Sequence, residues 1–239
     1  VFSIWFDQTY LHYAYTDTSA SIGLFYRRGF PNADGTITWS TAEQTAVYGV
    51  SGITLSLPFV AVDTGNRPWI VYRHQEEGNY YPYVTRSSST NGTWSTDTGF
   101  PFKLSNDHSL GWISTITPLT NNKMYVVSFS AVNNYRRGRL WNGTAWEKEE
   151  SPIIISSINC APHSIVAQGD DIHLAFLDTP NHNIKYRKRF YSNNSWGTEV
   201  TIRADTTYTS DPILSINTLT NNLYCFWMGS PSANFIYYK

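Results

Sequence analysis

The sequence predicts an all-β protein, specifically a β-propeller of four-stranded blades, and three observations support this prediction. A turn followed by a large aromatic residue recurs along the chain, with tryptophans at positions 39, 94, 146 and 196. Their spacings of 55, 52 and 50 residues lie in the range of a propeller blade. Short apolar alternations separated by polar turns repeat in the same phase, and no segment shows helical periodicity. A composition of 41% hydrophobic and 16% aromatic residues supplies a sizeable core.

Each period is expected to begin with two strands joined by a polar turn. The first strands are expected over residues 2–6, 58–62, 113–119, 163–168 and 212–219. The second strands are expected over residues 10–15, 69–73, 124–130, 172–177 and 223–227. Turns rich in Asp, Asn, Gly and Thr separate them, as at residues 63–66, 120–122, 169–171 and 220–222.

The third strands are expected to carry most of the basic residues, over residues 24–28, 80–86, 135–140, 184–190 and 235–239. Eleven of the 17 Lys and Arg residues fall there. We interpret them as facing solvent or packing between blades, because a long basic side chain can cover apolar surface. The fourth strand of each period is expected to begin at or just after the recurring Trp, and we interpret that Trp as packing between blades.

We expect one propeller domain over residues 1–239, with blades over about 1–50, 51–110, 111–160, 161–210 and 211–239, the last of them incomplete. Two architectures fit this count. One is a five-bladed ring closed by pairing of the termini, and the other is a ring of six or seven blades of which this chain is a part. The chain begins at Val1 without a Met or a signal sequence, and we favour part of a longer polypeptide.

Charge and motifs argue against several classes of partner and cofactor. Lys and Arg total 17 and Asp and Glu total 18, so no global field attracts nucleic acid or an acidic membrane. No apolar run is long enough for membrane insertion. No cofactor is expected, since G-x-S-x-G, G-x-G-x-x-G and P-loop patterns are absent. No metal site is expected either, because the candidates lack close ligand spacing: His108, His163, His182, Asp107, Asp178 and Asp211.

Cysteines and sequons bear on the location of the protein. Cys160 and Cys225 could pair, although two buried thiols are the favoured interpretation. Candidate glycosylation sites of the N-x-[ST] type occur at Asn91, Asn142 and Asn193, each in the turn before a Trp. Good turn chemistry is the favoured interpretation of these sequons, and glycosylation of a secreted protein is the alternative. The composition favours an extracellular or cell-surface location.

The turn-plus-Trp element resembles the Asp-box, or BNR, repeat of sialidase-like propellers, whose pattern is Ser-x-Asp-x-Gly-x-Thr-Trp. Asp34, Thr38 and Trp39 match it best. The stretch Asn91-Gly92-Thr93-Trp94, preceded by Arg86-Ser87, is similar with Asn in place of Asp. In that family the box is a structural turn distant from the active site, so the resemblance implies a fold and not a chemistry. Sialidase activity is not expected, because the family's Phe-Arg-Ile-Pro motif is absent.

Four residues are catalytic candidates: His74, Tyr80, Tyr81 and Arg86. The stretch over residues 73–86 looks like the corresponding stretch of BNR-type propeller polysaccharide lyases. In those enzymes His and Tyr act as acid and base while Arg neutralises a uronate. Removing a proton beside a carboxylate needs a cation on that carboxylate and a base of intermediate pKa. The competing interpretation is an ordinary polar loop.

A propeller binds ligands at one mouth of its central channel, on loops between blades and between second and third strands. The ligand-binding candidates on these loops are Arg73, His74, Asp107, His108, Trp112, His163, Tyr208 and Asp211. Aromatic faces can cover the apolar side of a sugar while polar groups bind its hydroxyls. These residue types therefore favour carbohydrate recognition.

The leading hypothesis is a non-catalytic, extracellular, sialidase-like propeller that binds glycan or a protein partner within a larger surface or secreted assembly. One alternative is a glycan-cleaving enzyme, a polysaccharide lyase before a sialidase. Convergence of His74, Tyr80 or Tyr81, and an Arg in one pocket would favour it. The other alternative is a structural repeat domain of a surface filament or fibre.

Overall fold

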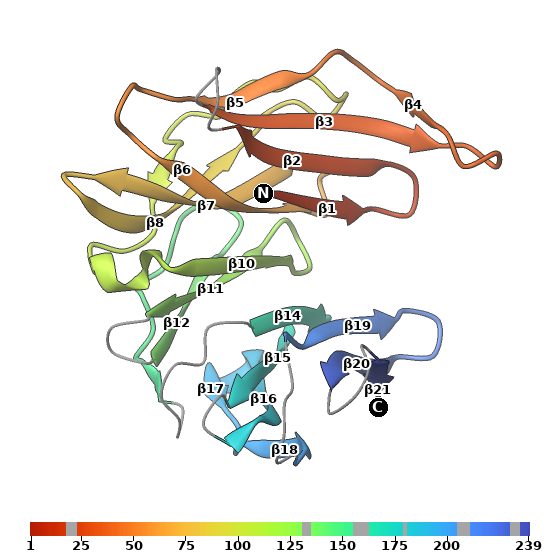
Figure 1. Ribbon diagram of the computed structural model, residues 1–239, viewed down its shortest axis with the longest axis vertical. Helices are drawn as coiled ribbons and strands as arrows, with labels where there is room; N and C mark the ends of the chain where they lie inside the picture. The colour runs from red at the N-terminus through yellow and green to blue at the C-terminus, as the bar shows by residue number, and fades with distance from the viewer. Residues whose placement is uncertain (18–22, 131–134, 155–162, 179–180, 205–210, 230–234) are drawn as a thin grey trace.

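The computed structural model describes residues 1–17, 23–130, 135–154, 163–178, 181–204, 211–229 and 235–239. These residues form five antiparallel sheets that follow one another along the chain and around the molecule (Figure 1). The all-β prediction is confirmed. The helices in the described ranges are short 3₁₀ turns, η1 (His108–Gly111) and η3 (Tyr191–Asn193), and none could cross a membrane.

The sheets are numbered here in chain order. Sheet 1 contains β1 (Phe2–Phe6), β2 (Leu11–Asp17), β3 (Gly23–Pro31), β4 (Ile37–Trp39) and β5 (Gln44–Tyr48). Sheet 2 contains β6 (Leu55–Val62), β7 (Pro68–Glu76), β8 (Asn79–Arg86) and β9 (Phe102–Lys103). Sheet 3 contains β10 (Ile113–Pro118), β11 (Met124–Ser130), β12 (Tyr135–Trp141) and β13 (Ile153–Ile154).

Sheet 4 contains β14 (His163–Gln168), β15 (Asp171–Asp178), β16 (Asn183–Phe190), β17 (Ser195–Trp196) and β18 (Val200–Arg203). Sheet 5 contains β19 (Ile213–Asn217), β20 (Asn222–Gly229) and β21 (Phe235–Tyr238). Within each sheet, strands adjacent in sequence pair in antiparallel register.

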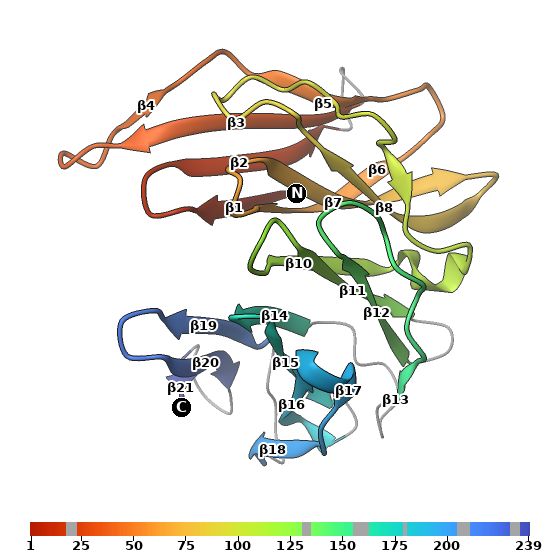
Figure 2. The same cartoon turned by 180° about the vertical axis from the view of Figure 1, so that it is seen from behind.

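The first strands β1, β6, β10, β14 and β19 lie innermost, each against the first strand of the next sheet (Figures 1 and 2). Side-chain hydrogen bonds join two of these pairs. Ser3 Oγ accepts the Val60 N–H at 3.2 Å, and Ser164 Oγ accepts the Leu214 N–H at 3.0 Å. This is the arrangement of propeller blades around a central axis.

Three of the four recurring tryptophans pack against the preceding sheet. Trp94 lies 5.1 Å from Tyr26 between ring centroids, and Trp146 lies 6.1 Å from Trp69. Trp196 lies 6.5 Å from Tyr125. Trp39 belongs to sheet 1, which no described sheet precedes, and the Arg27 guanidinium covers its ring at 4.4 Å. The tryptophan is therefore a packing residue between sheets, as expected from the sequence.

The turn before each tryptophan shows one hydrogen-bonding pattern. A side-chain carbonyl or carboxylate oxygen accepts both the backbone N–H and the hydroxyl of the residue two positions later. The distances are 2.9 and 2.7 Å for Asp34 with Thr36, 3.0 and 2.7 Å for Asn91 with Thr93, 3.1 and 3.0 Å for Asn142 with Thr144, and 3.2 and 2.8 Å for Asn193 with Ser195. Because this turn requires a hydroxyl two positions after the Asn, its hydrogen bonds alone account for the N-x-[ST] sequence. Glycosylation stays a prediction.

Third-strand arginines pack between sheets. Arg136 is fully buried, with its guanidinium 4.9 Å from the Phe129 ring and 5.0 Å from the Phe176 ring. Arg189 is 1% exposed and lies over Tyr125 of the preceding sheet. Since the planar guanidinium stacks on aromatic rings and is weakly hydrated, these positions suit arginine better than lysine.

The fourth strands are more broken than the sequence suggests. In sheets 1 and 4 the fourth position is split into two short strands, and in sheet 2 β9 begins eight residues after Trp94. The register also shifts where β5 and β18 pair with the third strand. These strands lie at the outer edge of their sheets, where only one side is paired, so irregular pairing costs less there.

Sheets 1 and 5 each have one apolar face that no described residue packs against. On sheet 1 it carries Phe2, Ile4 and Phe6, and on sheet 5 Ile213, Met228, Ile236 and Tyr238, all more than half exposed. The opposite faces pack against sheets 2 and 4. Among described residues, β1 pairs only with β2 and β21 only with β20, so the terminal pairing that would close a five-bladed ring is not present.

Candidate functional site

The central cavity has a volume of about 410 Å³ and is lined by the first strands of all five sheets. Its wall combines apolar groups such as Trp5 and Phe59 with the polar side chains of Ser3, Thr115 and Ser164. Two residues expected to bind ligand, His163 and Asp211, also line it. The volume and the mixture of apolar surface with a few polar groups are typical of small-ligand sites.

His163 and Asp211 differ in their surroundings. His163 is buried, and its Nε2 lies 3.3 Å from the carbonyl oxygen of Val127. Because a carbonyl only accepts, Nε2 carries a proton and the ring is held by β11 of sheet 3. Asp211 is exposed just before β19 and is the one carboxylate among the described residues of the cavity wall. Asp211 can therefore accept hydrogen bonds from a ligand without rearrangement of the fold.

A second group of polar side chains lies on one face of sheet 2. It lies at the end of the sheets at which His163 and Asp211 are found. This mouth cluster comprises His74, Glu76, Tyr81, Tyr83 and Lys103. His74 pairs across the hairpin with Tyr81, and Tyr83 pairs with Lys103, which places all of them on one face. Lys103 Nζ lies 2.6 Å from Glu76 Oε2 and 3.4 Å from the centroid of the Tyr81 ring.

Hydrogen bonds and burial set the charges of the mouth cluster. Burial alone would raise the pKa of Glu76, but hydrogen bonds from Lys103 and Tyr83 outweigh it and lower that pKa. Burial lowers the pKa of His74, and this effect exceeds the opposing attraction of Glu76 3.7 Å away. At neutral pH the cluster therefore presents a neutral imidazole beside a carboxylate–ammonium pair.

The turn η1 and its two capping residues contain the next three candidates, and the turn is tied to sheets 2 and 3. Asp107 caps it, accepting the N–H of Ser109 at 3.0 Å and its hydroxyl at 2.6 Å. The hydroxyl of Tyr135 donates to the other Asp107 oxygen. Although burial alone would raise the pKa of Asp107, these bonds lower it. The turn thereby places His108 6.3 Å from Tyr81 between ring centroids and leaves Trp112 49% exposed.

Arg73 and Tyr80 lie on the opposite face of sheet 2 from His74 and Tyr81, because successive residues of a strand point to opposite faces. The Arg73 guanidinium lies 4.2 Å over the Tyr80 ring, and its Nε donates to Ser56 Oγ at 2.8 Å. The structure thus brings His74 and Tyr81 together without Arg73. The cation beside them is Lys103.

Arg86 lies at the other end of β8, away from the mouth. Its guanidinium forms an ion pair with Asp97 and lies 4.8 Å from the Trp69 ring. The same guanidinium lies 4.9 Å from the ring of Trp141 in β12, so Arg86 has a packing role between sheets 2 and 3. Tyr208 falls outside the described residues.

Sequence reasoning missed Glu76, Tyr83, Lys103 and Tyr135 as parts of the site. A signal for two of them was present in the tight turn at Glu77-Gly78, where both residues adopt positive φ. A two-residue hairpin turn sets the register of its strands, which would have placed Glu76 and Tyr83 on the same face as the pair of His74 and Tyr81. Lys103 and Tyr135 come from other strands, and no local pattern points to them.

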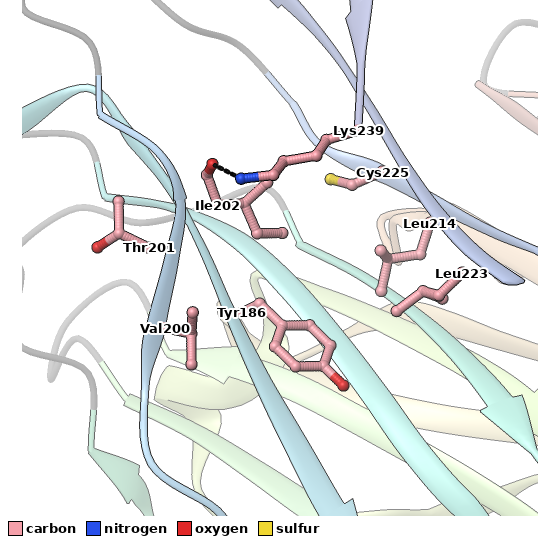
Figure 3. A pocket seen from close by; sticks show the side chains of 8 residues that line it. All are labelled: Tyr186, Val200, Thr201, Ile202, Leu214, Leu223, Cys225 and Lys239. Atoms are coloured by element: carbon pink, nitrogen blue, oxygen red, sulfur yellow. Dashed lines mark hydrogen bonds between the residues drawn. The ribbon is translucent and has the colours of Figure 1, made fainter.

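An apolar hollow of about 270 Å³ lies between sheets 4 and 5 (Figure 3). It is lined by Tyr186, Val200, Thr201, Ile202, Leu214, Leu223, Cys225 and Lys239. The Lys239 ammonium donates to the Ile202 carbonyl at 3.4 Å. Cys225 is a buried free thiol, and burial raises its pKa to about 11, so it stays protonated and unreactive at neutral pH. Cys160 lies outside the described residues.

Comparison with known proteins relates the fold to glycan-active proteins. No family model matches the chain, and no curated protein does. A protein of unknown function from Dyadobacter fermentans has a TM-score of 0.68 at 10% identity, over 98% of this chain and 76% of its own. The NanB sialidase of Streptococcus pneumoniae has a TM-score of 0.66 at 10% identity, over 97% of this chain and 56% of its own.

An ulvan lyase of polysaccharide lyase family PL25 has a TM-score of 0.62 at 9% identity, over 93% of this chain and 60% of its own. The chain shares the fold of a sialidase and of a polysaccharide lyase. It spans little more than half of each of those two chains. At such low identity the likeness concerns the propeller fold alone, and the chemistry of this propeller depends on its own residues.

Proposed function

We propose that this chain is a non-catalytic, glycan-binding propeller that acts outside the cell or at its surface. The observation that carries the proposal is the central cavity of about 410 Å³, whose wall combines apolar side chains with His163 and Asp211. Exposed Trp112, directly before the cavity-lining Ile113, offers an aromatic surface near its entrance. Such a combination suits a sugar, whose ring has both an apolar face and hydroxyl groups. Residues 1–239 form one propeller domain in this proposal.

The second candidate function is glycan cleavage of the lyase type, favoured by the mouth cluster. A neutral imidazole at His74 can accept a proton, and Lys103 can offset the charge of a uronate. Both lie next to Tyr81 on one face of sheet 2. Hydrolysis by two carboxylates has less support, because Asp211 has no carboxylate partner among the described residues of the cavity wall.

A panel of purified polysaccharides and glycans, scored for binding and for new unsaturated or reducing ends, tests both candidates. We expect binding without new ends. Trp112→Ala should weaken that binding about tenfold, since stacking on an indole contributes on the order of 1–2 kcal/mol. Asp211→Asn should weaken it severalfold through the loss of a charged acceptor.

Leu219→Ala provides the matched control for this experiment. Leu219 is 94% exposed in the turn at the opposite end of sheet 5, so its truncation should leave binding unchanged. New unsaturated ends that disappear in His74→Ala would establish the lyase and refute the non-catalytic proposal. Glycan binding that is insensitive to both Trp112→Ala and Asp211→Asn would place the site elsewhere.

The uncovered faces of sheets 1 and 5 favour membership of a larger assembly. Trp94, Trp146 and Trp196 each pack on a preceding sheet, whereas Trp39 has no such sheet among the described residues. Each of these two faces therefore lacks the neighbouring sheet that packs against the corresponding face of the other described sheets. We propose that a further β-sheet with apolar faces packs between sheets 1 and 5, as in a propeller of more than five blades.

This assembly proposal predicts that the isolated chain exposes an apolar surface that promotes self-association. The wild-type chain should bind an apolar fluorescent dye and self-associate in size-exclusion chromatography. The double variant Ile4→Lys/Ile236→Lys should do neither and keep the wild-type melting temperature, since substitutions at exposed positions change stability by about 0.5 kcal/mol or less. A large drop in melting temperature would instead show that the faces pack against each other in a closed ring.

A further inference from the structure

A second polar pocket lies between sheets 1 and 2, at the end of the strands opposite to the mouth cluster. It has a volume of about 300 Å³ and is lined by Asp7, Thr9, Tyr10, His12, Arg28, Asn66 and Thr90. These residues come from the β1–β2 turn, the β6–β7 turn, the second and third strands of sheet 1, and the segment after β8. We call it the turn-side pocket.

The interior of the turn-side pocket is rigid. His12 is 2% exposed; its Nε2 lies 2.9 Å from Asp7 Oδ2 and its Nδ1 lies 2.8 Å from the hydroxyl of Tyr26. The other Asp7 oxygen accepts the N–H groups of Thr9 and Tyr10 at 2.8 and 2.6 Å. With both oxygens held, the carboxylate has a fixed orientation and can still accept further hydrogen bonds through its remaining lone pairs.

Arg28 supplies the opposite charge. Its guanidinium lies 4.2 Å over the Tyr10 ring, and one terminal nitrogen donates to the Thr90 carbonyl at 2.6 Å. Its Nε is buried without a hydrogen-bond partner among the described residues. Gly92 lies beside it with φ of 99°, and a Cβ at that position would come within 3.1 Å of Nε. The glycine therefore lets the guanidinium lie close against the segment after β8.

The charges of the pocket balance. Burial would raise the pKa of Asp7, but hydrogen bonds from Tyr10, His12 and Thr9 lower it, so the carboxylate is ionised at neutral pH. Burial lowers the pKa of His12, which keeps that ring neutral. One carboxylate then faces one guanidinium. A charged ligand would meet one group of like sign, whereas a neutral hydroxylated ligand can use both.

We propose that the turn-side pocket is a second binding site that takes one neutral sugar residue. Asp7 accepts its hydroxyl groups, and Arg28 with the Asn66 amide donates to its oxygens. The hydroxyls of Thr9 and Thr90 can donate or accept hydrogen bonds, and the Tyr10 ring forms an aromatic wall of the pocket. The volume is at the small end of the range for ligand pockets, which suits a single ring. This inference is independent of glycan binding at the central cavity.

Titration of the chain with neutral monosaccharides, followed by saturation-transfer NMR and calorimetry, tests the proposal. We expect at least one neutral sugar to bind. Asn66→Gly should weaken it severalfold, because glycine tolerates the native φ of 61° while removing only the amide. Arg28→Gln should weaken it at least as much. Asn221→Gly, at a φ of 58° in the equivalent turn of sheet 5, is the matched control and should have no effect.

Asn66→Gly also separates this site from the central cavity, since Asn66 lies outside the cavity wall and its replacement should leave the glycan binding that depends on Trp112 unchanged. The proposal is overturned if no neutral monosaccharide binds to the wild-type chain. It is also overturned if Asn66→Gly and Arg28→Gln leave binding unchanged, or if uronates or amino sugars bind more tightly than neutral ones.

Discussion

Replacing Glu150 with leucine is expected to lower the free energy of unfolding by about 3–5 kcal/mol, because it leaves a buried guanidinium without its counter-charge. Glu150 accepts from Arg189 Nε at 2.9 Å and from a terminal nitrogen at 2.5 Å. Its second oxygen accepts the Tyr125 hydroxyl at 2.6 Å and the Trp196 indole N–H at 3.3 Å. This carboxylate therefore joins sheet 3 to sheet 4. Urea denaturation monitored by tryptophan fluorescence measures the loss.

A double-mutant cycle isolates the contribution of the ion pair. Arg189→Met alone should also destabilise, since it removes the donors that Glu150 binds. The double variant Glu150→Leu/Arg189→Met should recover much of the loss, because replacing a buried ion pair by apolar groups is often close to neutral. A loss in the free energy of unfolding of less than about 1 kcal/mol for Glu150→Leu would contradict this prediction. It would mean that water solvates the Arg189 guanidinium despite its 1% exposure.

Gly111→Ala is expected to destabilise the chain by about 1–3 kcal/mol and to disturb the candidate site more than the fold. A Cβ at residue 111 would lie 2.1 Å from the carbonyl oxygen of Tyr80 and 2.2 Å from its carbon. Both are backbone atoms of β8, which cannot move without breaking ladder hydrogen bonds. The turn η1 must shift instead and carry His108 and Trp112 with it. We expect glycan binding to fall by more than tenfold.

Gly197→Ala is the matched control for this substitution. The nearest atom to its added Cβ belongs to the Phe190 side chain at 3.2 Å, and that side chain is partly exposed and can rotate. Melting temperature and glycan binding of both variants should be measured together. Wild-type binding in Gly111→Ala would show that η1 does not position the ligand-binding residues.

Much of the fold could be predicted because it depends on local chemistry. The alternation of apolar residues places β1 and β14 at the residues expected, 2–6 and 163–168. The Asp and Asn turns recur because a side-chain oxygen two residues before a hydroxyl closes the turn by itself. The fourth strands were harder to predict, since an edge strand paired on one side tolerates breaks that carry no sequence signal.

The candidate site could be predicted only in part. Residues near one another in the chain specify the repeat, its turns and the polar stretch that holds Asp107 and Trp112, whereas His74, expected on a loop, lies within β7. Folding of the whole chain places Lys103 beside Tyr81 and turns Arg73 away from His74. It also buries Arg136 and Arg189. Such neighbours depend on strand register and sheet packing, which bring together residues with no local relation in sequence.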